Sequence, residues 1–202
     1  PGLEHAEVRG VQGSTLLMSA GTINLHIPGE HNIHNALAAI RTCQVLGIPF
    51  DAIKSGIEAV RQSFGRGEIL PGDVTIIQDC YNASPESVRA AAALLREAEG
   101  RRVAVLGAMK ELGTFAEYSH GGIAREVLNS GVDQLFLFGE EYEPVSRTLS
   151  QEPVVRYAES FEILVREVTE YVRPGDTVLL KGSRAMELER LTPVIRGEEI
   201  GA

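Results

Sequence analysis

The chain has 202 residues, of which 44% are hydrophobic and 23% are charged, and its formal net charge is −9. This composition suits one or two globular domains with a hydrophobic core. The negative charge argues against a general nucleic-acid or anionic-membrane surface. Two cysteines do not make a disulfide framework, and no apolar run approaches the roughly 20 residues of a membrane span, so we expect a cytoplasmic protein.

The first part of the chain, residues 1–64, contains short strands followed by helices. Residues 7–27 read as strands, with Ala20-Gly21 as the turn between "STLLMS" and "TINLHI". Apolar residues at helical spacing then predict a helix over "PGEHNIHNALAAIRTCQVLG", and Asp51 is the expected N-cap of a second helix, "AIKSGIEAVRQ". The glycines of "SFGRGE" interrupt the pattern, so we place a domain boundary between residues 64 and 65. Because the chain opens on Pro1, we expect a piece of a longer protein.

The second part, residues 65–202, alternates short apolar strands with amphipathic helices from residue 71 onward. Ser84-Pro85-Glu86 is a strong helix-start signal directly after the first of these strands. This alternation predicts an α/β fold with a doubly wound, mostly parallel Rossmann-like sheet. The expected strands are "VTIIQD", "RVAVLG", "QLFLFG", "VVRYA" and "TVLLKGS", and the expected helices lie near 85–98, 117–129, 141–150, 160–172 and 184–191.

Polar residues gather where three of these strands end. They are residues 79–82 after the first strand, 107–113 after the second and 181–184 after the last. Ligands of such sheets bind beyond the carboxyl ends of the strands, so we expect the functional site there. Asp79 either hydrogen-bonds nearby backbone amides or binds the hydroxyls of a sugar, and Asn82 is either a turn residue or a ligand contact. Cys80 reads as a packing residue.

Two other groups of residues have more than one interpretation. His31 and His34 are spaced i, i+3, but without a third ligand nearby they argue only weakly for a metal, and we expect none. Asn32 and Asn35 lie on one helix face, where an amide matches the edge of an adenine, although N-capping by Glu30 or Asn32 is the more ordinary explanation.

The turn "KGSR", residues 181–184, either holds a phosphate or carboxylate through Lys181 and the backbone amides or is a solvated turn. The pattern around Gly107 and Gly113 is not G-x-G-x-x-G, which disfavours a nicotinamide-dependent dehydrogenase. The sequence also contains no G-x-x-x-x-G-K-[ST] phosphate loop. If the protein uses ATP, this chain therefore holds only part of the ATP site.

Several motifs in order along the chain resemble the Mur ligase family. They are "GEHNIHNALAAI", "GR" at 65–66, "DCYNASPESVRAA", "AVLGAMKELG", the following His120 and "LLKGSRAMELER", and they span residues 29–190. The combination D-x-Y-N-A plus K-G-S-R-x-M is most similar to the members that join D-alanyl-D-alanine to UDP-N-acetylmuramoyl-tripeptide. Other Mur ligases and folylpolyglutamate synthetase share the fold but differ at these turns.

The resemblance implies that residues 1–64 are the tail of a central ATP-binding domain and residues 65–202 a Mur ligase C-terminal domain. The implied activity is ATP-dependent amide-bond formation through an acyl phosphate, in the synthesis of peptidoglycan precursors. The implied cofactors are ATP and Mg²⁺, with the Mg²⁺ ligands mainly in upstream domains. The alternatives are a non-catalytic nucleotide- or anion-binding relative, or a Mur or folylpolyglutamate-type ligase with a different amino substrate.

The resemblance also assigns roles to single residues. Asn35 matches an adenine contact, Arg66 an arginine near the ATP phosphates and Asp79 a ribose-binding acid. The residues that match turns facing the incoming amino substrate and the reacting phosphate are Asn82, Lys181, Ser183 and Arg184, with catalytic roles for Lys181 and Ser183.

The chain departs from the family pattern at two positions. Ala108 stands where the family usually has Asp, and Lys110 stands where an apolar or small residue is common.

Overall fold

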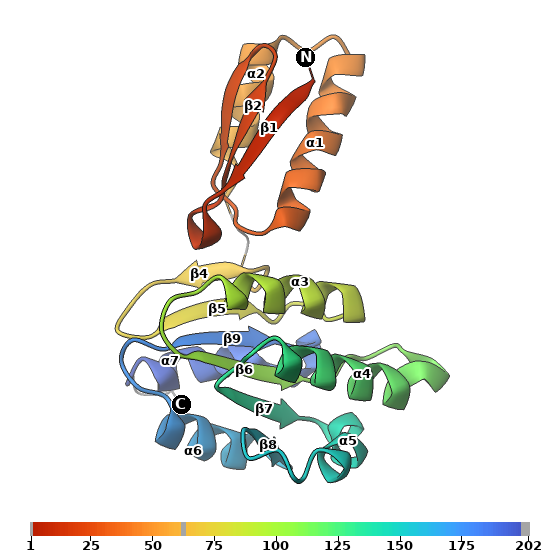
Figure 1. Ribbon diagram of the computed structural model, residues 1–202, viewed down its shortest axis with the longest axis vertical. Coiled ribbons are helices and arrows are strands. Elements are labelled where there is room, and N and C mark those ends of the chain that lie inside the picture. The colour runs from red at the N-terminus through yellow and green to blue at the C-terminus, as the bar shows by residue number, and fades with distance from the viewer. Residues whose placement is uncertain (1, 62–63, 199–202) are drawn as a thin grey trace. The chain divides into compact units, whose positions relative to one another are not determined.

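The computed structural model describes residues 2–61 and 64–198, which belong to two compact units (Figure 1). The first unit covers the described residues up to 61 and the second unit those from 64 onward. Each has its own hydrophobic core. Among the described residues, no helix has both the length and the apolar character needed to cross a membrane.

The first unit is a three-stranded antiparallel sheet with two helices packed against it. The strands follow one another in the order β1-β2-β3, and alternate residues of β2 and β3 face the helices. The elements are β1 (Leu3–Val8), β2 (Ser14–Met18), β3 (Gly21–Leu25), α1 (Glu30–Val45) and α2 (Phe50–Ala59). Its core contains Leu16, Ile23, Leu25, Ile33, Ile40 and Ile53.

Two details of this sheet differ from the sequence-based expectation. The strand β1 was not expected, because "LEHAEV" has mostly exposed side chains and so shows no apolar face in the sequence. The hairpin between β2 and β3 turns at Ser19 and Ala20, and Gly21 already pairs with Met18 as the first residue of β3.

The expected N-caps of both helices in this unit are wrong. Helix α1 begins after Gly29 without a side-chain cap, so neither Glu30 nor Asn32 caps it. Gly29 has a φ of 97°, a conformation that glycine adopts without strain. Helix α2 begins after Pro49, and Asp51 lies inside its first turn. Both helices therefore start through backbone geometry and have no capping side chain that the sequence could reveal.

The second unit is built on a six-stranded sheet with the strand order β4-β5-β9-β6-β7-β8. Only the edge strand β4 runs antiparallel to its neighbour, and the other pairs are parallel. The last strand of the chain is inserted between β5 and β6, as in a doubly wound sheet. The predicted fold class is confirmed. The strands are β4 (Glu68–Leu70), β5 (Thr75–Asp79), β6 (Arg102–Gly107), β7 (Gln134–Phe138), β8 (Val155–Ala158) and β9 (Thr177–Lys181).

Helices cover both faces of this sheet, with α3 and α4 on one face and α6 and α7 on the other (Figure 1). Side chains alternate between the faces along each strand. In β6, for example, Ala104 and Leu106 belong to the core under α3 and α4, whereas Val103 and Val105 belong to the core under α6. The helices are α3 (Pro85–Arg96), α4 (Ala116–Asn129), α5 (Glu143–Thr148), α6 (Phe161–Tyr171) and α7 (Leu191–Ile195).

The ends of the second unit's elements follow the sequence in most places. Ser84 is the N-cap of α3 and accepts a hydrogen bond from the backbone N–H of Ser87, so the helix-start signal is confirmed. The prediction of a helix near 184–191 is wrong. Glu187 has a φ of 47° and separates two short 3₁₀ turns, after which α7 begins. Strand β4 was not expected either, because three residues are too short to show a period.

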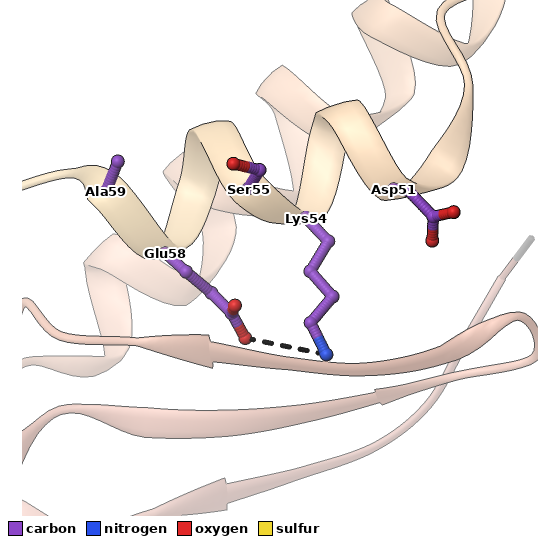
Figure 2. Close-up of a pocket in the computed structure, with 5 residues that line it drawn as sticks. All are labelled: Asp51, Lys54, Ser55, Glu58 and Ala59. Atoms are coloured by element: carbon purple, nitrogen blue, oxygen red, sulfur yellow. Dashed lines mark ion pairs between the residues drawn. The ribbon is translucent and has the colours of Figure 1, made fainter.

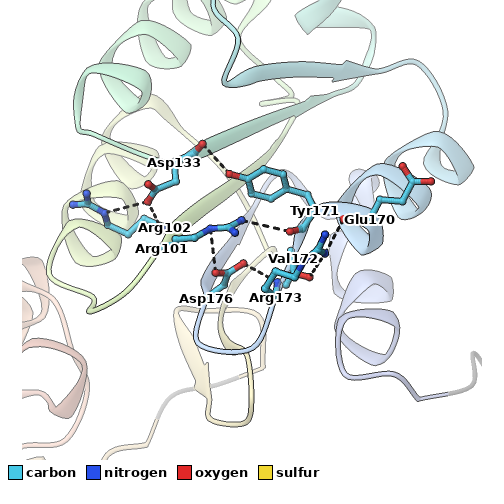
Figure 3. A network of polar contacts seen from close by, with 8 residues as sticks. All are labelled: Arg101, Arg102, Asp133, Glu170, Tyr171, Val172, Arg173 and Asp176. Atoms are coloured by element: carbon cyan, nitrogen blue, oxygen red, sulfur yellow. Dashed lines mark hydrogen bonds and ion pairs between the residues drawn. The ribbon is translucent and has the colours of Figure 1, made fainter.

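Charged residues also cross-link the amino ends of the strands (Figure 3). Asp176 pairs with Arg101, with 3.4 Å between Oδ1 and Nε, and its Oδ2 accepts the backbone N–H of Arg173 at 2.8 Å. Asp133 accepts the backbone N–H of Arg102 at 2.8 Å. These carboxylates satisfy backbone donors at the start of β6 and in the turn between α6 and β9, so this network stabilises the sheet.

Candidate functional site

The carboxyl ends of β5 and β9 carry a buried ion pair. Asp79 and Lys181 are the last residues of these neighbouring strands and stand directly opposite each other. The Lys181 Nζ lies 3.1 Å from Asp79 Oδ2 and donates to the backbone oxygen of Asn82 at 2.5 Å. Lys181 is only 1% exposed, whereas the Asp79 side chain is 22% exposed. The interpretation of Lys181 as part of a solvated turn is therefore wrong.

This arrangement leaves part of the pair's hydrogen-bonding capacity for a ligand. An ammonium group has three donors, and the two acceptors named above account for two of them. A carboxylate has two oxygens, and Lys181 pairs with one oxygen of Asp79. The ion pair thus fixes the direction of the Asp79 carboxylate at the edge of the sheet. The contact that Asp79 makes here is the ion pair with Lys181, and its binding of sugar hydroxyls stays a prediction.

The turn after β5 combines packing and polar roles. Cys80 is fully buried, and its burial, followed by the nearby Glu189 carboxylate, raises the pKa of the thiol to about 12. Cys80 is therefore a neutral packing residue, as predicted. Asn82 is exposed, and its Oδ1 accepts the backbone N–H of Ala83 at 2.9 Å. This contact is the turn role expected of Asn82, while its role toward a ligand stays a prediction.

Arg66 is held beside the same turn. Its guanidinium carbon lies 4.1 Å from the centre of the Tyr81 ring, a cation–π contact. The backbone N–H of Tyr81 donates to the oxygen of Gly65 at 2.9 Å, which fixes the segment before Arg66 against the turn. Sequence reasoning included Arg66 among the site residues but assigned nothing to Tyr81. The two contacts bring the cation and the Asp79 turn together.

The "KGSR" turn after β9 packs closely against the end of β6. A Cβ atom on Gly182 would lie 3.0 Å from the Cα of Gly107, so this approach requires glycine. The backbone N–H of Ser183 donates to Ala108 at 3.1 Å, and Ser183 Oγ accepts the backbone N–H of Lys110 at 2.9 Å. Ser183 is 4% exposed. Its hydroxyl proton is not used by that bond and can be donated elsewhere.

The positions where the chain departs from the family pattern lie beside Ser183. Ala108 is fully buried, and the Lys110 Nζ pairs with Glu141 Oε1 at 2.6 Å. Arg184 is largely exposed and pairs with Glu189, and its guanidinium lies 5.9 Å from the ring of Phe64. The carboxyl edge thus gathers cations, a hydroxyl and a carboxylate from three adjacent strand ends.

One histidine at this edge was not recognised as part of the site. His120, in α4, is fully buried, and its Nε2 accepts the backbone N–H of Met109 at 2.9 Å. Its Nδ1 lies 2.6 Å from the backbone oxygen of Ala116. Burial lowers the pKa of His120 below its ordinary value. In the sequence His120 was only one of the family-like motifs, eleven residues beyond Met109, and carried no assigned role.

Asn35 lies in the first unit, on α1, and its Nδ2 donates to Asn32 Oδ1 at 3.3 Å. Both amides are on the first turns of this helix, as the spacing predicted. The adenine contact implied for Asn35 stays a prediction. Among residues 2–61 and 64–198, no group of three or more His, Cys, Asp or Glu side chains could hold a metal ion.

The first unit also has a shallow hollow along α2 (Figure 2). An ion pair in its lining joins Lys54 Nζ to Glu58 Oε1 at 3.8 Å (Figure 2). Glu58 Oε1 also accepts the backbone N–H of Asn24 at 2.9 Å, which ties α2 to β3. These contacts serve the packing of the unit, and the hollow adds no residue to the candidate site.

The sequence of the chain matches a known protein family and several of its characterised members. The family profile described as "Mur ligase, glutamate ligase domain" matches residues 65–184. The chain belongs to the Mur ligase family. A curated relative in Treponema pallidum (strain Nichols), named UDP-N-acetylmuramoyl-tripeptide–D-alanyl-D-alanine ligase, is 36% identical over 193 residues, which are 94% of this chain and 42% of the relative.

Solved structures of Mur ligases have the same fold. A crystal structure of MurF from Acinetobacter baumannii is similar with a TM-score of 0.84 and 25% identity, over 97% of this chain and 44% of that one. The MurF ligase of Thermotoga maritima in complex with ADP has a TM-score of 0.79 and 25% identity, over 97% and 46%. The chain thus spans less than half the length of these Mur ligases.

Proposed function

We propose that this chain is the C-terminal portion of an ATP-dependent ligase that joins D-alanyl-D-alanine to UDP-N-acetylmuramoyl-tripeptide. The observation that carries the proposal is the 36% identity, over nearly the whole chain, with a relative that bears that name. In this proposal residues 1–64 end the central ATP-binding domain and residues 65–202 form the C-terminal domain. The enzyme would act in the cytoplasm, in peptidoglycan precursor synthesis.

The residues at the carboxyl edge suit a nucleotide. We assign the Asp79 carboxylate to the ribose hydroxyls, because its side chain is partly exposed and is held in direction by Lys181. Arg66, stacked on Tyr81, provides a fixed cation for the phosphates. Separately, in the first unit, we assign the Asn35 amide to an adenine edge. The solved relative with bound ADP supports a nucleotide site in this fold. Mg²⁺ would be held mainly by the upstream part of the enzyme.

When bound, ATP would transfer its γ-phosphoryl group to the substrate carboxylate and leave as ADP. The amine of the dipeptide would then attack the acyl phosphate, releasing inorganic phosphate and a proton as the amide forms. The chain's own residues stabilise the negative charge that develops on the phosphoryl oxygens and on the tetrahedral oxyanion. Lys181 offers its remaining N–H donor and Ser183 its hydroxyl proton, in a setting where both are almost fully buried. Arg184 and Asn82, which are exposed, contact the incoming amino substrate.

Phosphate release by the full-length enzyme tests this function. We expect release from Mg-ATP to require both UDP-N-acetylmuramoyl-tripeptide and D-alanyl-D-alanine, and mass spectrometry to show the pentapeptide product. Turnover with a different amino compound in place of the dipeptide would favour another ligase specificity. Nucleotide binding without any turnover would favour a non-catalytic relative.

The 202-residue chain alone provides a second test. ATP affinity comes largely from the phosphates and their metal, so we expect calorimetry to give a Kd for Mg-ATP of about 1 mM, or about −4 kcal/mol. Submicromolar binding by this chain would contradict the proposed division of the site between upstream and C-terminal domains.

A further inference from the structure

His120 is a buried titratable group of the second unit to which the proposed reaction gives no role. Both of its ring nitrogens have backbone partners. The carbonyl of Ala116 can only accept and the N–H of Met109 can only donate, so Nδ1 carries the proton and Nε2 presents its lone pair. This single tautomer is the neutral imidazole. A proton on Nε2 would place two donors against each other and would break the bond to Met109.

The loop that His120 holds is the loop that holds Ser183. Met109 stands between Ala108, whose oxygen accepts the N–H of Ser183, and Lys110, whose N–H donates to Ser183 Oγ. The three consecutive loop residues are therefore bonded to the imidazole on one side and to the "KGSR" turn on the other. A shift of the Met109 amide therefore moves the Ala108 oxygen that holds the Ser183 backbone and the Lys110 N–H that holds the Ser183 side chain.

The surroundings of the imidazole favour this neutral state. The ring of Tyr142 meets it edge-on, with 4.7 Å between the ring centres. The charged groups that face it are Glu141 and Lys110, which shift the pKa of His120 in opposite directions, while burial has the larger, lowering effect. Glu141 and Lys110 also pair with each other, which reduces their separate influence.

We propose that neutral His120 is a positioning residue, which holds the Met109 amide so that the Lys110 N–H orients Ser183 Oγ for the reaction. The inference rests on the proposed function, and it adds a residue that acts at one remove from the substrate. In this proposal the loop after β6 keeps its position only while the imidazole of His120 is unprotonated.

Two variants of the full-length enzyme separate the two bonds of His120. His120→Gln keeps an acceptor near the position of Nε2, whereas His120→Asn keeps a donor near Nδ1 and loses the contact with Met109. We expect His120→Asn to lower kcat at least about tenfold with little change in the KM for ATP, because small misplacements of a reacting group are costly. His120→Gln should stay within about threefold of the original kcat.

The pH profile and a matched control exclude a merely structural role. Tyr142→Phe removes only the buried hydroxyl of Tyr142, which has no hydrogen-bond partner, so this variant should leave kcat unchanged. The original enzyme should lose kcat toward acid pH through protonation of His120, and His120→Gln should lack that part of the profile. Equal kcat losses in the Gln and Asn variants, or an unaltered acid limb in His120→Gln, would overturn the proposal.

Hydrogen exchange in the 202-residue chain tests, without any ligase activity, whether the bond between His120 and Met109 holds the Lys110 amide against Ser183. The Lys110 amide should exchange at least about tenfold faster in His120→Asn than in the original chain, and near the original rate in His120→Gln. If the full-length enzyme fails to ligate the dipeptide but this exchange difference appears, the proposed substrate is wrong and the positioning contact stands. If Lys110 exchanges at one rate in all three chains, the positioning contact itself is wrong.

Discussion

The two ends of the six-stranded sheet both carry charged residues, but they use them differently. At the amino ends, Asp176 and Asp133 accept backbone N–H groups and pair with Arg101 and Arg102 (Figure 3). At the carboxyl ends, Lys181 and Asp79 pair with each other and keep hydrogen-bonding capacity beyond that pair. One end stabilises the strands, and in the proposed function the other end presents groups to a ligand.

This difference teaches that charge at a strand end does not by itself indicate a binding site. The decisive feature is whether the charged pair keeps a partly exposed group with hydrogen-bonding capacity to spare. Asp176 is 3% exposed and its carboxylate contacts the Arg101 side chain and the Arg173 backbone N–H, whereas Asp79 remains partly exposed beside a lysine that fixes its direction. Substitutions at the amino ends should therefore affect stability, and those at the carboxyl ends should affect activity.

The largest expected effect is at Lys181. Lys181→Met in the full-length enzyme keeps most of the side chain's volume but removes the cation that lies against Asp79 and Asn82. We expect kcat for ligation to fall about a hundredfold, or about 2.7 kcal/mol in transition-state stabilisation. Steady-state kinetics with both substrates at saturation would measure this loss.

Lys181→Arg is the matched control for charge. A planar guanidinium does not replace a point charge in a site that is 1% exposed, so we expect it to restore little of the activity. If Lys181→Met turned over at nearly the original rate, the cation would have no part in the reaction and the carboxyl edge would resemble the amino edge.

The next effect concerns the amino edge. Asp176→Asn removes the charge that pairs with Arg101 and weakens the acceptor of the Arg173 N–H. Because the carboxylate is buried but Arg101 is partly exposed, we expect the free energy of unfolding to fall by about 2 kcal/mol. Asp133→Asn, at a half-exposed site, should cost less than about 1 kcal/mol. Urea denaturation of the chain would contradict this ranking if the two losses were equal.

A smaller effect follows from the lowered pKa of His120. The folded chain keeps the imidazole neutral at pH values where the unfolded chain, with the ordinary pKa of 6.5, takes up a proton. Stability should therefore fall as the pH drops from 6.5 toward the lowered folded pKa, by at most roughly 1.4 kcal/mol per pH unit. His120→Gln should flatten this dependence in urea titrations. An equally steep slope in that variant would assign the effect to other groups.

Much of the second unit was predictable because its strands and helices differ strongly in period. The stretch "VTIIQD" ends in Asp79 and "TVLLKGS" carries Lys181 near its end, and a parallel sheet brings such strand ends to one edge. The sequence alone therefore predicts Asp79 and Lys181 at the same edge of the sheet. Helix ends were predictable where a side chain formed the cap, as at Ser84, and not where the backbone did, as at Gly29.

The contacts of the site were not predictable, because they join residues far apart in sequence. The register of β5 against β9, which pairs Asp79 with Lys181, depends on the whole sheet. The bond from Met109 to His120 depends on how α4 returns over the loop after β6. The left-handed conformation of Glu187 interrupts a helix that the local sequence favours. These features come from tertiary packing and leave little mark on local periodicity.

One paired measurement tests the contrast between the two edges most directly. The same change, Asp to Asn, is made at residue 79 and at residue 176 of the full-length enzyme, and kcat/KM for ATP and the melting temperature are measured for both. We expect Asp79→Asn to lower kcat/KM for ATP about tenfold, mainly through KM, and also to lower the melting temperature, because the buried Lys181 loses its counter-ion. Asp176→Asn should lower the melting temperature and leave kcat/KM unchanged at a temperature where it is folded. A larger loss of kcat/KM in Asp176→Asn than in Asp79→Asn would contradict the assignment of the carboxyl edge as the functional site.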